Sequence, residues 1–153
     1  MNRGTVIQRD TREKKNEHIS DVFQTKGIKQ LRSKLPYGDY MSLDNPRKVI
    51  ERKASLSELC NNIGTNHDTF KNELKEALFY GIDVVILIED AERNCWEDIK
   101  TWENPNRFKS THSINGEKLF NILSTLQAFY LFDLRFCDPA ETGNVILELL
   151  KAA

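Results

Sequence analysis

The stretch DVVILIE, at residues 83–89, is an almost unbroken run of apolar, mostly β-branched side chains between two acids. A strand with one solvated face alternates apolar and polar residues, whereas a strand covered on both faces reads as a continuous apolar run. The stretch therefore predicts a central strand in a sheet that has helices on both sides. This places the chain in the α/β class.

Apolar residues at helical spacing on either side of this strand predict the helices that cover it. Ser55 and Glu58 have the spacing of a capping box and begin one short helix. The other helices are expected at residues 16–25, 68–80 and 116–128, with a helical turn at 96–102 and a last helix from Asp138 to Leu150. The buried face of the helix at 68–80 is marked by Phe70, Leu74, Ala77 and Leu78.

Further strands are expected where β-forming residues lie between turn signals. Residues 39–43 and 48–54 read as a hairpin across a turn at 44–47, and residues 28–35 as extended or irregular chain. Other strands are expected at residues 5–8 and 129–136, and a polar loop at 104–113, where His112 could touch DNA. The whole chain, residues 1–153, reads as one domain.

Composition is that of an ordinary globular protein, with 39% hydrophobic and 29% charged residues and a net charge of −1. No apolar run approaches the roughly 20 residues that span a membrane, and the N-terminus has no signal-peptide core, so we expect a cytoplasmic protein with no membrane partner. Cys60, Cys95 and Cys137 lack the spacing of a zinc site or a disulfide framework. With so little net charge, binding to nucleic acid would have to use local basic clusters.

Three short charged motifs lie at the edges of predicted strands. They are Asp10-Thr11-Arg12-Glu13, Gly38-Asp39-Tyr40 and Glu51-Arg52-Lys53. Taken singly, such motifs are more often a helix cap, a turn and a solvated strand. Their occurrence together and in this order favours a common site.

Strand geometry brings the central charges of these motifs together. Glu51 and Lys53 are two residues apart, so they point to the same side of the strand, and Arg52 points to the other. Pairing in the hairpin can place Asp39 beside them, and Asp10 can join from the end of the first strand. Like charges facing each other destabilise a sheet, and a divalent cation between them removes that conflict.

This combination suits metal-dependent hydrolysis of a phosphodiester. A metal ion acts as a Lewis acid and lowers the pKa of a bound water. The lysine can orient or help to deprotonate that water, and it can offset charge on the scissile phosphate. The residues with the strongest geometric case are Asp39, Glu51 and Lys53.

The three motifs resemble the nuclease domain of the XPF family of structure-specific DNA endonucleases. That family has Gly-Asp, a variable gap and Glu-Arg-Lys, with Asp-x-Arg-Glu at the end of the first strand. The resemblance covers roughly residues 6–151. It implies a restriction-endonuclease-like fold of the PD-(D/E)xK superfamily, with a central mixed β-sheet flanked by helices on both faces. It also implies branched or structured DNA, such as a flap, fork or junction, as the substrate.

The resemblance also implies roles for individual residues. Asp10, Asp39 and Glu51 would ligate Mg²⁺ or Mn²⁺, and Lys53 would be catalytic. Two arginines, Arg12 and Arg52, would support the site through phosphate contacts or an ion-pair network around the acids. Glu13 would lie behind the metal ligands.

Two features depart from the family pattern. The family has an Asp four residues after the motif lysine, where this chain has Ser57, followed by Glu58. Glu58 either replaces that acid or only caps its helix. Many members also carry helix-hairpin-helix and helicase-like domains, and neither is expected in residues 1–153. Such a compact form of the nuclease would suit a phage or mobile element.

Catalysis is the favoured reading because the motif acids and the lysine are all present. A non-catalytic DNA-binding or dimerisation subunit on the same fold is the alternative, and a restriction-type nuclease is a third option. A homodimer is expected through the C-terminal strand and helix. The apolar residues of that helix are Val145, Ile146, Leu149 and Leu150.

Overall fold

The computed structural model describes residues 5–109 and 113–151, so the predicted DNA contact at His112 lies outside the described residues. Its strands are β1 (Val6–Arg9), β2 (Lys29–Arg32), β3 (Tyr40–Ser42), β4 (Asn45–Lys53), β5 (Asp83–Glu89) and β6 (Asp133–Cys137). Its α-helices are α1 (Glu17–Thr25), α2 (Leu56–Gly64), α3 (His67–Phe79), α4 (Gly116–Tyr130) and α5 (Thr142–Lys151). Two short 3-10 helices are η1 (Trp96–Thr101) and η2 (Pro139–Glu141).

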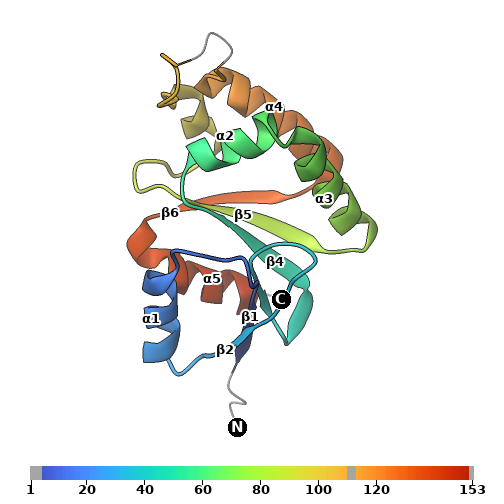
Figure 1. Ribbon diagram of the computed structural model, residues 1–153, viewed down its shortest axis with the longest axis vertical. Helices are drawn as coiled ribbons and strands as arrows, with labels where there is room; N and C mark the ends of the chain where they lie inside the picture. Colours follow the sequence, from blue (N-terminus) through green and yellow to red (C-terminus); the bar gives the residue numbers. More distant parts are fainter. Residues whose placement is uncertain (1–4, 110–112, 152–153) are drawn as a thin grey trace.

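The six strands form one mixed sheet in the order β2-β1-β3-β4-β5-β6. Helices α1 and α5 lie on one face of this sheet, and α2, α3 and α4 lie on the other (Figure 1). This confirms the predicted α/β architecture with helices on both faces. Within the described residues, no helix has the length and apolar character needed to cross a membrane.

Strand β5 is covered on both faces, as its apolar run predicts. It pairs in parallel with β4 on one side and β6 on the other. Ile86 and Ile88 pack into the core beneath α2, α3 and α4, while Val85 and Leu87 pack into the core beneath α1 and α5. Because β4 is its direct neighbour, the charged motif on β4 lies beside the buried centre of the sheet.

The β3–β4 hairpin turns earlier than predicted. Ser42 lies opposite Asn45, so the turn is Leu43-Asp44, and the prediction of a turn at 44–47 is wrong. The pairing shifts register between Met41 and Ser42, which leaves Pro46 where β3 does not pair with it. Proline lacks an N–H, and such an irregularity is where a strand tolerates it.

The boundary between α4 and β6 also differs from the prediction. The helix runs on to Tyr130, and β6 begins only at Asp133, so the expected strand at 129–136 is too long. Leu131 ends the helix with a left-handed backbone, φ 59°. Glycine is the usual residue for that conformation, and its absence removes the signal for a helix end.

Smaller predictions have mixed outcomes. Of the two alternatives for residues 28–35, extended or irregular, the structure shows an extended edge strand, β2, which pairs in parallel with β1. Leu78, predicted to face the core from α3, is 40% exposed, whereas Phe70, Leu74 and Ala77 are buried. Asp138 is a cap as predicted, because its Oδ1 accepts a hydrogen bond from the Ala140 N–H at 2.9 Å, but it caps the 3-10 helix η2, and α5 begins only at Thr142.

Gly116 is required where η1 packs against the start of α4. A Cβ atom at this position would lie 2.4 Å from the carbonyl oxygen of Ile99. We expect Gly116→Ala to lower the free energy of unfolding by about 1–3 kcal/mol in urea titrations, because backbone atoms must move. Gly64→Ala is the matched control, since a Cβ at Gly64 meets nothing within 4 Å. Equal stability of the two variants would contradict the close approach of η1.

Candidate active site

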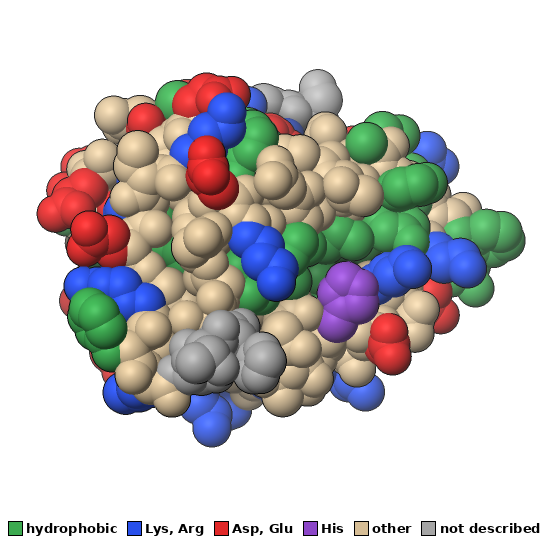
Figure 2. Space-filling model, turned by 90° about the horizontal axis from the view of Figure 1, so that it is seen from above, with side chains coloured by type: hydrophobic (Ala, Val, Ile, Leu, Met, Phe, Trp, Pro, Cys, Tyr) green, Lys and Arg blue, Asp and Glu red, His purple; other side chains and the backbone are tan. Residues whose placement is uncertain are grey.

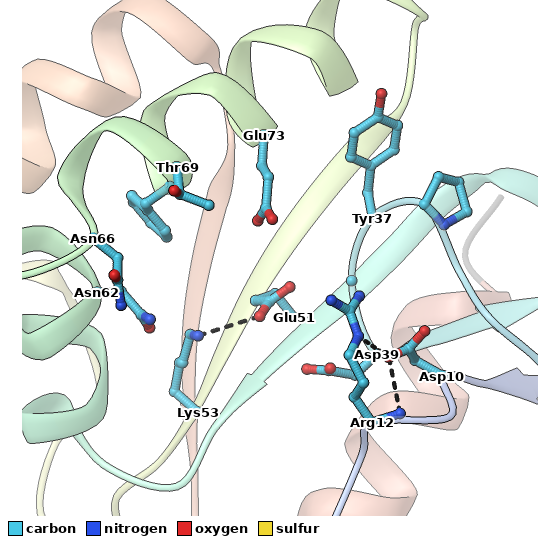
Figure 3. A pocket seen from close by; sticks show the side chains of 13 residues that line it. Asp10, Arg12, Tyr37, Asp39, Glu51, Lys53, Asn62, Asn66, Thr69 and Glu73 are labelled. Atoms are coloured by element: carbon cyan, nitrogen blue, oxygen red, sulfur yellow. Dashed lines mark hydrogen bonds and ion pairs between the residues drawn. The ribbon is translucent and has the colours of Figure 1, made fainter.

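The three charged motifs meet at one cavity of about 290 Å³ (Figure 3). One side of it is built by the end of β1, the loop before β3 and the end of β4. The other side is built by α2 and α3. The lining residues from the motifs are Asp10, Arg12, Gly38, Asp39, Glu51 and Lys53, and the others are Pro36, Tyr37, Asn62, Asn66, Thr69, Phe70 and Glu73.

Alternation along β4 places Glu51 and Lys53 on the cavity side, as predicted. Lys53 Nζ lies 3.2 Å from Glu51 Oε1, and the lysine side chain is only 8% exposed. The two side chains therefore form an ion pair on the side of the cavity that β4 builds.

Asp39 is held against the same strand by backbone hydrogen bonds. Its N–H donates to the Ile50 carbonyl at 2.7 Å, and its Oδ2 accepts from the Arg52 N–H at 2.8 Å. Gly38 makes this approach possible because its φ is 72° and a Cβ there would lie 3.0 Å from Val49 Cβ. The Gly-Asp pair is thus a structural unit, in which the glycine lets the aspartate reach β4.

Asp39 carries an electrostatic conflict. Burial, followed by the negative charges of Glu51 and Glu13, raises the pKa of the Asp39 carboxyl well above its ordinary value. The hydrogen bond from Arg52 and the charge of Lys53 oppose this rise without cancelling it. A cation placed among these acids would favour the ionised carboxylate.

Asp10 lines the same cavity, but protein donors occupy its oxygens. Oδ1 accepts from the Leu35 N–H at 2.8 Å, and Oδ2 accepts from the Arg12 N–H at 3.1 Å and from Arg12 Nε at 2.9 Å. Burial opposes ionisation, yet these hydrogen bonds outweigh it and lower the pKa of the Asp10 carboxyl. Asp10 therefore holds the 35–36 segment and orients Arg12, whose side chain is 70% exposed over the cavity.

Arg52 points away from the cavity, as predicted, into a buried ion-pair network. Its Nε and Nη2 donate to the two oxygens of Glu13 at 2.8 and 2.9 Å, and its Nη1 donates to Glu89. Burial opposes the charge on Arg52, but the two glutamates raise the pKa of its guanidinium. Of the two supporting roles that the resemblance implies, the structure gives Arg52 the ion-pair network.

Glu58 takes part in a helix cap and is not one of the residues that line the cavity. Its Oε2 accepts from the Ala54 N–H at 2.9 Å, and its own N–H donates to Ser55 Oγ at 3.2 Å. Of the two interpretations of this residue, the geometry supports the cap.

Sequence reasoning missed the side of the cavity that the helices build. Asn62, Asn66, Thr69 and Glu73 project into it from α2 and α3 (Figure 3). Asn62 Oδ1 is buried and has no hydrogen-bond partner among the residues that the structure describes. Glu73 is exposed as a residue, but desolvation of its carboxyl in the cavity, followed by the charge of Glu51, raises its pKa.

The carboxylates suit a cation that brings most of its own ligands. In the described parts of the chain, no three His, Cys, Asp or Glu side chains are arranged to hold a metal ion on their own. Mg²⁺ is usually bound by one or two carboxylates, several waters and phosphate oxygens. Asp39 and Glu51 match that smaller requirement.

Comparisons with known proteins identify a matching family and similar folds. The ERCC4 domain family matches residues 9–149. Among solved structures, the chain is similar to XPF from Aeropyrum pernix, with 22% identity and a TM-score of 0.67 over 95% of this chain and 63% of that one. It is also similar to XPF from Aeropyrum pernix in complex with DNA, with 21% identity and a TM-score of 0.66 over 96% of this chain and 64% of that one. No curated protein matches.

These matches confirm the predicted fold. The chain spans less than two thirds of the length of the two structures.

Proposed function

Because the chain belongs to the ERCC4 domain family, we propose that it is a metal-dependent endonuclease that hydrolyses phosphodiester bonds in branched or structured DNA. The observation that carries the proposal is the convergence of Asp39, Glu51 and Lys53 in one cavity. A similar XPF structure is a complex with DNA, which supports DNA as the partner. Flap, fork and junction DNA are the substrates to examine first.

In this proposal Asp39 and Glu51 hold Mg²⁺ or Mn²⁺. The bound ion would supply Lewis-acid activation of water and would offset charge at the phosphate. Lys53, fixed beside Glu51, orients the attacking water and adds a positive charge near the scissile phosphate. Arg12 has its Nε on Asp10, which leaves its terminal nitrogens to contact a DNA phosphate.

The test is cleavage of labelled duplex, flap, fork and four-way-junction DNA with Mg²⁺, with Mn²⁺ or with EDTA. We expect cleavage with either metal and none in EDTA, and faster cleavage of the branched substrates. Cleavage that persists in EDTA would contradict the proposed mechanism. DNA binding without cleavage of any substrate would support a non-catalytic subunit instead.

The variant Glu58→Gln distinguishes a helix-capping role of Glu58 from a role as a metal ligand. The amide keeps a carbonyl oxygen that can accept from Ala54 N–H, but it removes the negative charge that a metal ligand needs. We expect cleavage rates within about twofold of wild type, and a change in unfolding free energy below about 1 kcal/mol. A hundredfold fall in cleavage would instead assign Glu58 the place of the family's missing aspartate.

We also propose a homodimer through part of the predicted C-terminal region, the segment that leads into β6 rather than the last helix. Ile146 and Leu150 of α5 are buried in the protein's own core, and Val145 and Leu149 are partly buried against it, so little of this helix's apolar face is left for a partner. Phe129 and Leu131, just before β6, are 69% and 66% exposed. Figure 2 shows apolar side chains gathered towards the right of the view, and Phe129 and Tyr130 of α4 line a groove there with residues of α3.

A charged substitution at this surface should separate the dimer. We expect the wild type to sediment at about twice its 17.8 kDa chain mass, and Phe129→Glu to sediment as a monomer. Phe108→Glu is the control, because Phe108 is 87% exposed in another part of the surface. A monomeric wild type would overturn this proposal.

A further inference from the structure

Glu73 is a cavity carboxylate that lies outside all three charged motifs. It is exposed on α3, and its side chain points into the cavity towards Glu51 (Figure 3). Among the described residues its carboxylate makes no hydrogen bond or ion pair. Glu76, three residues further along α3, instead accepts a hydrogen bond from the Tyr37 hydroxyl at 3.4 Å.

Glu73 differs in this respect from Asp10, the third ligand that the family resemblance implies. Three donor groups already occupy the two oxygens of Asp10. Asp39 Oδ1 and Glu51 Oε2, like both oxygens of Glu73, have no hydrogen bond among the described residues. Oxygens free of protein donors are the ones that can turn to a cation or to its bound waters.

The side chains that line the cavity carry a net negative charge. Its lining contains four carboxylates, from Asp10, Asp39, Glu51 and Glu73, and two cationic side chains, from Arg12 and Lys53. With all six ionised, the formal charge is −2. One divalent cation balances the charge of −2. Without Glu73, the lining would carry a formal charge of only −1.

We propose that Glu73 is a further carboxylate of the cation site, acting with Asp39 and Glu51, while Asp10 holds Arg12 in place. This inference rests on the proposed function. The described carboxylates form no ready-made cage, so Glu73 would hold the ion through one of its bound waters. Mg²⁺ retains several of its waters in protein sites, so a ligand of this kind matches its chemistry.

Metal binding without DNA is the direct test. Calorimetric titration with Mn²⁺ should show about tenfold weaker binding to Glu73→Gln than to wild type, and about twofold or less for the control Glu76→Gln. Glu73→Asp, which keeps the charge on a shorter side chain, should recover part of the loss. In cleavage assays, Glu73→Gln should need about tenfold more Mn²⁺ for half-maximal rate and should approach the wild-type rate at saturation.

The outcomes separate this inference from the proposed function. Equal Mn²⁺ binding by wild type, Glu73→Gln and Glu76→Gln, together with weaker binding by Asp39→Asn, would overturn the role of Glu73 and leave the endonuclease proposal standing. Equal losses of Mn²⁺ affinity in Glu73→Gln and Glu76→Gln would also overturn it, because any negative charge on this part of α3 would then have the same effect. A wild type that neither binds Mn²⁺ nor cleaves DNA would overturn both.

Discussion

Asp39→Asn and Lys53→Ala are each expected to slow phosphodiester cleavage by about a thousandfold, which corresponds to about 4 kcal/mol of transition-state stabilisation. The asparagine keeps the size of the side chain and can still accept from the Arg52 N–H, but it loses the charge that holds a cation. The alanine removes the only amine that lines the cavity among the described residues. Single-turnover cleavage at saturating DNA measures both effects at the chemical step.

Matched controls keep this prediction specific. Lys48→Ala removes a lysine from the same strand, five residues before Lys53 and outside the cavity lining, and Asp44→Asn removes an exposed acid in the turn before β4. Both controls should cleave within about twofold of wild type. Both active-site variants should still fold, which circular dichroism can check. Wild-type rates in both active-site variants would show that the cavity is not where cleavage occurs.

The part of the site on β4 was predictable because strand geometry is local. Once residues 48–54 are recognised as a strand, alternation alone puts Glu51 and Lys53 on one side and Arg52 on the other. The apolar run at 83–89 then predicts a buried neighbour for that strand, and hence a fixed position for its charges. No knowledge of distant residues is needed for either step.

The helical side of the cavity was not predictable in this way. Glu73 lies among other polar residues of α3, and a carboxylate on a solvated helix face has the same sequence pattern as one that faces a cavity. Which turn of α3 faces β4 depends on how Phe70 and Leu74 pack beneath it. The pattern of hydrogen bonds around Asp10 is similarly non-local, because its partner Leu35 is 25 residues away.

Arg52→Met is expected to destabilise the fold by about 3–5 kcal/mol, the usual effect of removing one partner from a buried ion pair. The side chains of Arg52 and Glu13 are each 6% exposed, and that of Glu89 is 4% exposed. Methionine has a similar length, so it fills the space but leaves two buried carboxylates without their cation. Against a total stability of about 5–15 kcal/mol, such a loss is a large share. Urea unfolding at neutral pH measures it.

Arg135→Met is the control for this prediction. Arg135 lies on β6 and pairs with Asp133 at 3.0 Å, but the two side chains are 58% and 49% exposed. An exposed pair contributes about 0–1 kcal/mol, so this variant should unfold close to wild type. Similar losses of unfolding free energy in Arg52→Met and Arg135→Met would show that burial does not make the Arg52 ion pairs more important for stability.

The loss of stability caused by Arg52→Met should become smaller at acidic pH. Burial opposes ionisation of Glu89, but hydrogen bonds from Thr142, His18 and Arg52 lower the pKa of its carboxyl in the wild type. That contribution to stability is present above the ordinary glutamate pKa of about 4.3 and is lost as the pH falls through the lowered value. The variant lacks the cation and takes up protons more readily, so its stability deficit should narrow as the pH approaches about 4.

The same network links stability to the proposed site. Arg52 lies between Glu51 and Lys53 on β4, and its contacts with Glu13 and Glu89 anchor that strand to the end of β5 and to the segment after β1. It is a positioning residue, so its loss should act on cleavage through the folded fraction and the placement of β4. Adding Glu89→Gln to Arg52→Met should recover part of the lost stability, because one of the unpaired buried charges is then removed. No recovery in the double variant would show that Arg52 acts through packing rather than through its ion pairs.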